Sequence, residues 1–190
     1  MRSTKLLEKI LSNVHAMLHY AADDLTEQEW GTRIAPGQNM LGYIVWHSPR
    51  VQDNIIQIWI RGRPELAHSE RWGHWEAFRH LGCGVGINLA EADEIALGVE
   101  KADVLAYADA VHQETRAWLQ ELSDDDLDRV PEAQINLSSY AEYQTPGFHE
   151  DTDSLLGQPI WGLLMRPCIG HVHRHIGELM TAKDVIRASQ

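Results

Sequence analysis

Apolar residues recur at steps of three and four in four long segments of the chain. Such spacing places them along one face of an α-helix, from which a buried core can be built. The segments cover about residues 3–23, 39–60, 101–122 and 158–188. In the first segment this face comprises Leu7, Ile10, Leu11, Val14, Met17, Leu18 and Ala21. Because no strand-like alternation competes with the pattern, the sequence predicts an all-α protein.

Two long connections separate the predicted helices. Residues 61–98 are rich in Trp, His and Gly and are expected to hold short helical pieces, whereas residues 123–157 contain few core residues. Four helices joined by long crossover connections describe a four-helix bundle. Pro49 and Pro167 lie inside predicted helices, where each removes a backbone donor. We therefore expect a kink or a local bulge at Pro49 and a kink at Pro167.

Length and composition narrow the class of protein further. The 190 residues suffice for a buried core, so we predict a single domain over residues 1–190. The net charge of −12 argues against binding to nucleic acid or to an anionic membrane. The sequence also lacks the run of about 18 apolar residues that a membrane span needs. Two lone cysteines and no signal-peptide core fit a reducing compartment and predict a cytoplasmic protein.

The chain contains 11 histidines, and helix geometry separates those that face the core from the others. A helical residue advances about 100° around the helix axis. On the fourth predicted helix, His171 and His175 lie near the middle of the apolar stripe, whereas His173 points nearly the opposite way. His47 lies near the apolar stripe of the second helix. We therefore expect His47, His171 and His175 to face the bundle axis.

Inward-facing histidines at this spacing predict a metal site. Two imidazoles at i and i+4 project from adjacent turns, and a third from a facing helix completes a set of nitrogen ligands. Such a set suits Zn²⁺, Ni²⁺ or a related divalent ion and leaves positions open for water or substrate. The alternative is that these histidines only form hydrogen bonds inside the core.

Other histidines illustrate that spacing alone does not identify ligands. His15 and His19 are also four residues apart, but they lie off the apolar face of the first helix and are expected at the surface. His112 lies at the edge of the stripe of the third helix, and its orientation stays open.

Three stretches of sequence carry a family resemblance. The stretch APGQNMLGYIVWH at residues 35–47 ends in the first of the inward-facing histidines, and Arg50 and Asp53 follow it. Residues 170–178 contain the pattern H-x-x-x-H-x-G, and residues 103–122 form the third predicted helix. In this order and separation, the stretches resemble the DinB-like (DinB/YfiT-type) family of metalloenzymes over nearly the whole chain.

The resemblance implies a fold, a metal site and a class of chemistry. The fold would be a four-helix bundle of up-down-down-up topology, often a homodimer. The metal ligands, carried over by motif position, would be His47, His171 and His175. Relatives are implied to be metal-dependent enzymes that act with low-molecular-weight thiols, as S-transferases or isomerases, while others are hydrolases.

We therefore hypothesise a divalent-metal-dependent enzyme that transfers a low-molecular-weight thiol to a small electrophilic substrate. Three alternatives stay open. The protein is a metal-dependent hydrolase, a non-catalytic metal-holding module for binding or stress response, or a structural dimer whose buried histidines hold no metal.

Several residues near the motifs have two interpretations each. Arg50 or Arg174 holds an anionic thiol, or lies at the surface. Asp53 orients a ligand imidazole, or pairs with Arg50 at the surface. Tyr43 and Trp46 line the pocket, or pack into the core.

Two cysteine-containing features also have alternatives. Cys168, one turn before His171, either reaches the pocket or is a small buried core residue. The stretch GCGVG at residues 82–86 is similar to a phosphate loop, but no strand is predicted before it. We expect it to form a flexible turn near the pocket mouth.

Overall fold

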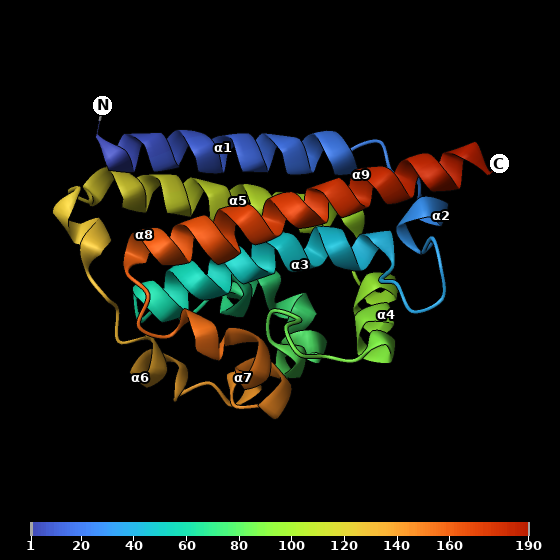
Figure 1. The fold of residues 1–190 in the computed structure, drawn as a ribbon. Coiled ribbons are helices and arrows are strands. Elements are labelled where there is room, and N and C mark those ends of the chain that lie inside the picture. Colours follow the sequence, from blue (N-terminus) through green and yellow to red (C-terminus); the bar gives the residue numbers. More distant parts are fainter. Residues whose placement is uncertain (1, 190) are drawn as a thin grey trace.

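The computed structural model describes residues 2–189, and within this range the protein is helical and has no β-strand. Four long helical stretches pack together (Figure 1). They are α1 (Ser3–Ala22), α3 (Leu41–Asp53), α5 (Lys101–Glu121) and the stretch from α8 (Ile160–Leu163) to α9 (Val172–Ala188). The all-α prediction is confirmed, because these helices coincide with the segments of apolar periodicity.

Contacts between the long helices bring the histidine-bearing elements together. Helix α1 packs against α5 and α9, and α3 packs against α5 and α9. In Figure 1, α1 and α9 run from left to right, whereas α3 and α5 run in the opposite direction. The apolar stripes meet in the core, where Val14, Ile44, Val104 and Leu179 are at most 2% exposed. Burial of each such side chain contributes about 1.5–3 kcal/mol.

Two of the long stretches contain a π-helical segment. One, Asn54–Ile60, continues α3, and the other, Leu164–His171, joins α8 to α9. Pro167 lies inside the second segment, where the wider turn accommodates a residue that lacks a backbone donor. Pro49 lies inside α3, so the irregularity expected at this proline begins only at Asn54. π-Helical turns are frequent at functional sites, and the second one ends at a histidine of interest.

The two long connections fold into short helices and turns, most of which lie below α3 in Figure 1. The first connection contains α4 (Leu89–Gly98) and 3₁₀ segments at Leu66–His68 and Glu70–Leu81. Along the chain, the short helix α2 (Glu27–Trp30) follows α1 and precedes α3. The second connection contains α6 (Ala133–Leu137), α7 (Pro146–Thr152) and 3₁₀ segments at Asp125–Asp128, Ala141–Tyr143 and Asp153–Leu155. Within residues 2–189, each helix is too short or too polar to cross a membrane.

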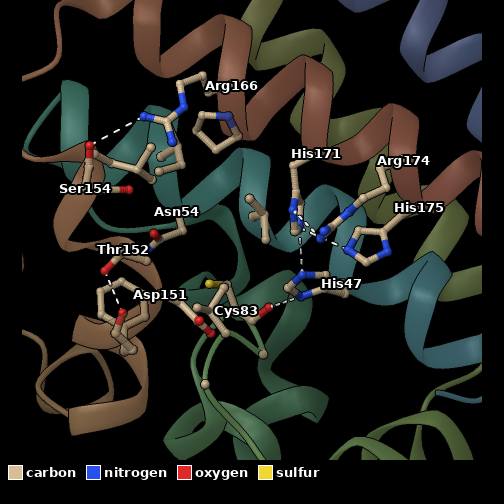
Figure 2. A pocket seen from close by; sticks show the side chains of 18 of the residues that line it. His47, Asn54, Cys83, Asp151, Thr152, Ser154, Arg166, His171, Arg174 and His175 are labelled. Carbon is tan, nitrogen blue, oxygen red and sulfur yellow. Dashed lines mark hydrogen bonds between the residues drawn. The ribbon is translucent and has the colours of Figure 1, made fainter. Parts of the chain in front are cut away.

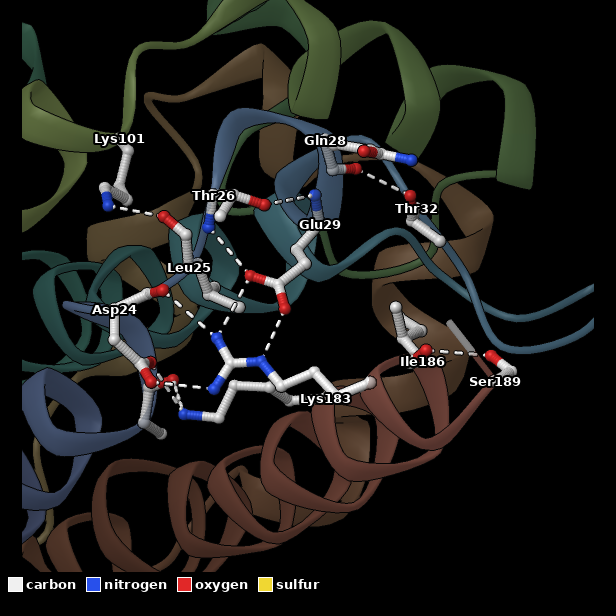
Figure 3. A network of polar contacts seen from close by, with 12 residues as sticks. Asp24, Leu25, Thr26, Gln28, Glu29, Thr32, Lys101, Lys183, Ile186 and Ser189 are labelled. Atoms are coloured by element: carbon white, nitrogen blue, oxygen red, sulfur yellow. Dashed lines mark hydrogen bonds and ion pairs between the residues drawn. The ribbon is translucent and has the colours of Figure 1, made fainter.

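An ion-pair network attaches the end of α9 to the turn after α1 (Figure 3). Lys183 donates from Nζ to Asp24 Oδ1 at 2.8 Å and to the backbone oxygen of Ala21 at 3.0 Å. Arg187 donates to Asp24 Oδ2 at 2.8 Å and to Glu29 Oε2 at 3.1 Å. Hydrogen bonds from these cations lower the pKa of Asp24 and the pKa of Glu29 to about 2. Both carboxylates are therefore charged at neutral pH and hold α9 against the N-terminal part of the chain.

Candidate metal centre

The three inward-facing histidines meet between α3 and α9. His47 projects from α3, His171 ends the π-helical segment, and His175 follows one turn later on α9. His171 Nε2 lies 3.0 Å from His47 Nε2 and 3.1 Å from His175 Nε2 (Figure 2). The ring planes are 71° to 87° apart, and one nitrogen of each ring lies within 4.8 Å of the other two. The structure thus brings together the three residues that the helix geometry selected.

Hydrogen bonds at the outer nitrogens orient two of the rings. His47 Nδ1 lies 2.7 Å from the backbone oxygen of Cys83, and His175 Nδ1 lies 2.9 Å from Glu178 Oε2. Since both partners only accept, each Nδ1 donates, and the Nε2 of each neutral ring keeps its lone pair. His171 has at most one Nε2 hydrogen to share between these two lone pairs. The cluster therefore lacks protons for its own acceptors, which fits a cation held among the three Nε2 atoms.

The protonation states of these histidines also favour metal binding. Burial, together with the neighbouring His175 and His171, lowers the pKa of His47 well below its ordinary value. Burial likewise lowers the pKa of His171 to about 4. The hydrogen bond from His175 lowers the pKa of Glu178, which keeps that carboxylate charged. At neutral pH His47 and His171 are therefore neutral imidazoles, the form that binds divalent ions.

A cavity of about 420 Å³ opens beside the three histidines. This volume lies in the range of small-molecule sites. Figure 2 shows Asn54, Thr152, Ser154 and Arg166 on one side of the pocket and Arg174 on the other, beside the histidines. Phe148 and Asp151 of α7 also line the cavity. The second connection therefore supplies a wall of the pocket, a role that its sparse apolar pattern did not predict.

The glycine-containing loop at residues 82–86 positions His47. Cys83 contributes the carbonyl that accepts from His47, and Tyr43 Oη donates to the Gly84 carbonyl at 2.6 Å. Gly84 has a φ of +85°, and a Cβ there would lie 2.7 Å from Tyr43 Oη. A phosphate loop presents N–H groups to its anion, whereas this loop presents carbonyls to the site. The resemblance to a phosphate loop is therefore not functional. The loop borders the pocket, as expected, and its carbonyls accept hydrogen bonds from Tyr43 and His47.

Arg50 occupies neither of its two predicted positions. It is 3% exposed and is not among the residues that line the pocket, and its Nη2 donates to the Gly82 carbonyl at 3.0 Å. Its Nη1 donates to Tyr107 Oη at 2.9 Å and lies 3.1 Å from Glu65 Oε1. The interpretations of Arg50 as a thiol anchor and as a surface residue are both wrong. By holding Gly82, Arg50 supports the adjacent Cys83 carbonyl that orients His47.

Asp53 belongs to the same buried cluster and does not touch the histidines. It is fully buried, accepts from Tyr107 Oη and from the backbone N–H of Ala67, and lies 3.6 Å from Arg50. The pairing with Arg50 is thus present, but in the core rather than at the surface. Burial and the neighbouring Glu65 raise the pKa of Asp53 to about 7. Glu65 carried no recognisable sequence signal, and Tyr107 was marked only as part of the third-helix stretch, since both meet Arg50 only through folding.

The other side chains with two interpretations lie either in the pocket wall or in the core. Tyr43 lines the pocket, whereas Trp46 is 1% exposed in the core beside Arg50. Cys168 is fully buried, which raises its pKa and agrees with a core role. Cys83 borders the pocket, and burial raises its pKa to about 12, so it is a neutral thiol. His15 and His19, expected at the surface, are half-buried between α1 and α5.

These features define an all-helical protein with a three-histidine cluster on two packed helices beside a small-molecule pocket. The sequence profile of the DinB superfamily matches residues 10–179, and the chain belongs to this superfamily. The match includes all three histidines and confirms the resemblance read from the motifs. No curated protein matches the chain.

Proposed function

We propose that this protein is a divalent-metal-dependent enzyme that joins a low-molecular-weight thiol to a small electrophile. The observation that carries the proposal is the convergence of three Nε2 atoms, with separations of 3.0 and 3.1 Å, beside a 420 Å³ pocket. His47, His171 and His175 would hold the ion. Zn²⁺ or Ni²⁺ bound by three neutral imidazoles would supply an open-sided Lewis acid that lowers the pKa of a thiol.

The protein itself offers no thiolate in this pocket. Cys83 is a neutral, buried thiol whose backbone is committed to His47, and Cys168 lies in the core. The sulfur nucleophile must therefore come from a second small molecule. In the proposed reaction the thiol loses its proton to solvent, and a sulfur–carbon bond forms. The leaving group departs with its electron pair.

Arg174 is suited to bind an anionic group of that thiol. Its Nη2 lies 3.2 Å from His171 Nδ1, and a guanidinium only donates. When His171 uses Nε2 as a ligand atom, its single hydrogen lies on Nδ1, so Arg174 has no acceptor there. Its donors are then free for a carboxylate in the pocket. Arg166, whose Nη1 donates to the Ser154 carbonyl, lines the same pocket and adds a second positive charge.

The test combines metal content with thiol consumption. Purified protein is loaded with Zn²⁺ or Ni²⁺, and glutathione is reacted with 1-chloro-2,4-dinitrobenzene while the thioether and released chloride are measured. We expect His47→Ala and His171→Ala to lose bound metal and activity. His173→Ala is the matched control, because His173 lies between His171 and His175 in the sequence without joining the cluster. Equal metal content in wild type and His171→Ala would contradict the proposed site.

The same assay distinguishes the proposed transferase from a binding module and from a hydrolase. Saturable thiol binding without product formation would contradict turnover and leave a binding module. Hydrolysis of a small ester or amide that does not need thiol would replace the transferase by a hydrolase. Arg174→Met tests the anion subsite, with a raised KM for glutathione and an unchanged KM for the neutral thiol 2-mercaptoethanol.

A further inference from the structure

A second cluster of ligand-type side chains joins α1 to α5. His15 and His19 project from consecutive turns of α1, and Asp109 faces them from α5. Asp109 Oδ1 lies 3.0 Å from His15 Nε2 and 3.1 Å from His19 Nε2. The three donor atoms all lie within 4.8 Å of one another. Two imidazole nitrogens and one carboxylate oxygen therefore point to a common position.

Contacts around this cluster orient its rings. His19 Nδ1 lies 3.0 Å from Asp23 Oδ1, so this nitrogen donates. A neutral His19 then turns the lone pair of Nε2 toward the oxygen of Asp109, which also carries lone pairs. His15 is held by His112, whose ring stacks on it at 4.3 Å with a 9° interplanar angle. Two acceptors in contact are stabilised by a cation between them or by protonation of His19.

The cluster differs from the other histidine–aspartate contacts of the protein. His74 meets Asp103 at 3.1 Å as a single exposed pair, without a second imidazole. The carboxylate Oδ1 of Asp109, in contrast, is shared by two imidazoles on adjacent helical turns. A carboxylate behind the imidazole, as Asp23 lies behind His19, is the usual arrangement around a metal-bound histidine. Glu178 lies behind His175 in the same way at the first centre.

We propose that His15, His19 and Asp109 form a second divalent-cation site, which takes Zn²⁺ or a similar ion and links α1 to α5. Two nitrogens and one oxygen are the ligand chemistry of Zn²⁺ rather than of Mg²⁺ or Ca²⁺, which prefer oxygen. The side chains are 18%, 25% and 50% exposed, so an ion reaches them from solvent. The ion binds only to the folded protein, because its ligands come from two helices. Its binding therefore stabilises the α1–α5 contact.

The test measures Zn²⁺ stoichiometry at pH 8, where free imidazole is neutral, by equilibrium dialysis and elemental analysis. We expect two equivalents in wild type, one in His19→Ala, one in His175→Ala and none in the double variant. His74→Ala is the matched control and retains both equivalents. A His19→Ala protein with the same zinc content as wild type would overturn the second site, whatever happens at His175. Loss from His19→Ala alone would instead support the second site and contradict the first.

Two further variants keep the test independent of folding defects. Asp109→Asn preserves the shape of the side chain while removing its charge, and it should also lose one equivalent. Asp23→Asn leaves the three ligands in place and should weaken this site about 10–100-fold without changing the stoichiometry. In His175→Ala, Zn²⁺ should raise the melting temperature, and in the double variant it should not. If Asp109→Asn and Asp23→Asn both bind Zn²⁺ like wild type, the contacts are ion pairs of protonated histidines and the proposal fails.

Discussion

Replacing Arg50 by Met should destabilise the protein strongly, because it leaves buried carboxylates without their counter-charge. Arg50 is 3% exposed, and Glu65 and Asp53 beside it are 2% and 0% exposed. Methionine fills a similar space along the helix, so the change removes mainly the charge and two hydrogen bonds, to Tyr107 Oη and to the Gly82 carbonyl. The other side chains that contact these carboxylates are the Tyr107 and Tyr143 hydroxyls and His68, whose pKa burial lowers to about 4, so none of them supplies a positive charge at neutral pH.

The expected loss follows from the burial of the whole cluster. Removing one partner of a buried ion pair costs about 3–5 kcal/mol. A protein of this size loses about 2–4 °C of melting temperature per kcal/mol, so the variant should melt about 6–20 °C lower. Domains are stable by only about 5–15 kcal/mol, so Arg50→Met would be close to the limit of folding. Arg116→Met is the control, because its pair with Glu8 is exposed and should contribute less than about 1 kcal/mol.

Urea unfolding at two pH values checks both the size and the origin of this loss. The folded pKa of Asp53 is raised above its unfolded value, so the folded state takes up a proton as the pH falls. Arg50 lowers the pKa of Asp53, so without Arg50 the carboxyl of Asp53 holds its proton more firmly still. The gap between wild type and Arg50→Met should therefore be smaller at pH 5 than at pH 7.5. A loss below about 1 kcal/mol at pH 7.5, or an equal gap at both pH values, would refute the reasoning.

Three further predictions concern other parts of the molecule. Glu178→Gln should weaken metal binding about 10-fold or more in a Zn²⁺ titration without unfolding the protein, and unchanged affinity would contradict its role behind His175. Gly84→Ala should lower the free energy of unfolding by at least about 1–2 kcal/mol and should also weaken metal binding. Gly37 likewise has a positive φ, but a Cβ there would meet no neighbouring atom, so Gly37→Ala should lower stability without changing metal affinity. The stability that Asp24 and Glu29 contribute is present above their unfolded pKa and is lost as the pH falls toward their folded pKa of about 2. Arg187→Met should therefore flatten the acid limb of the stability profile between about pH 4.5 and 2, and an unaltered limb would contradict the network.

Local periodicity was enough to predict the helices and the direction of three histidines. A side chain's angle around its own helix depends only on its position in the sequence, and apolar neighbours mark the buried face. His47, His171 and His175 could therefore be placed toward the axis before any packing was known. The same method put His15 and His19 at the surface, because it describes one helix at a time and does not see Asp109 on α5.

The tertiary structure alone decided what surrounds those histidines. His47 meets the Cys83 carbonyl 36 residues away, and Arg50 meets Tyr107 57 residues away. Such pairs form because particular helices pack and particular turns close, and neither event leaves a periodic trace in the sequence. Helical periodicity thus determined the fold class and the direction of three candidate ligands. Packing decided that Arg50 holds the loop that orients His47, that Asp53 joins the buried cluster around Arg50, and that α7 forms a wall of the pocket.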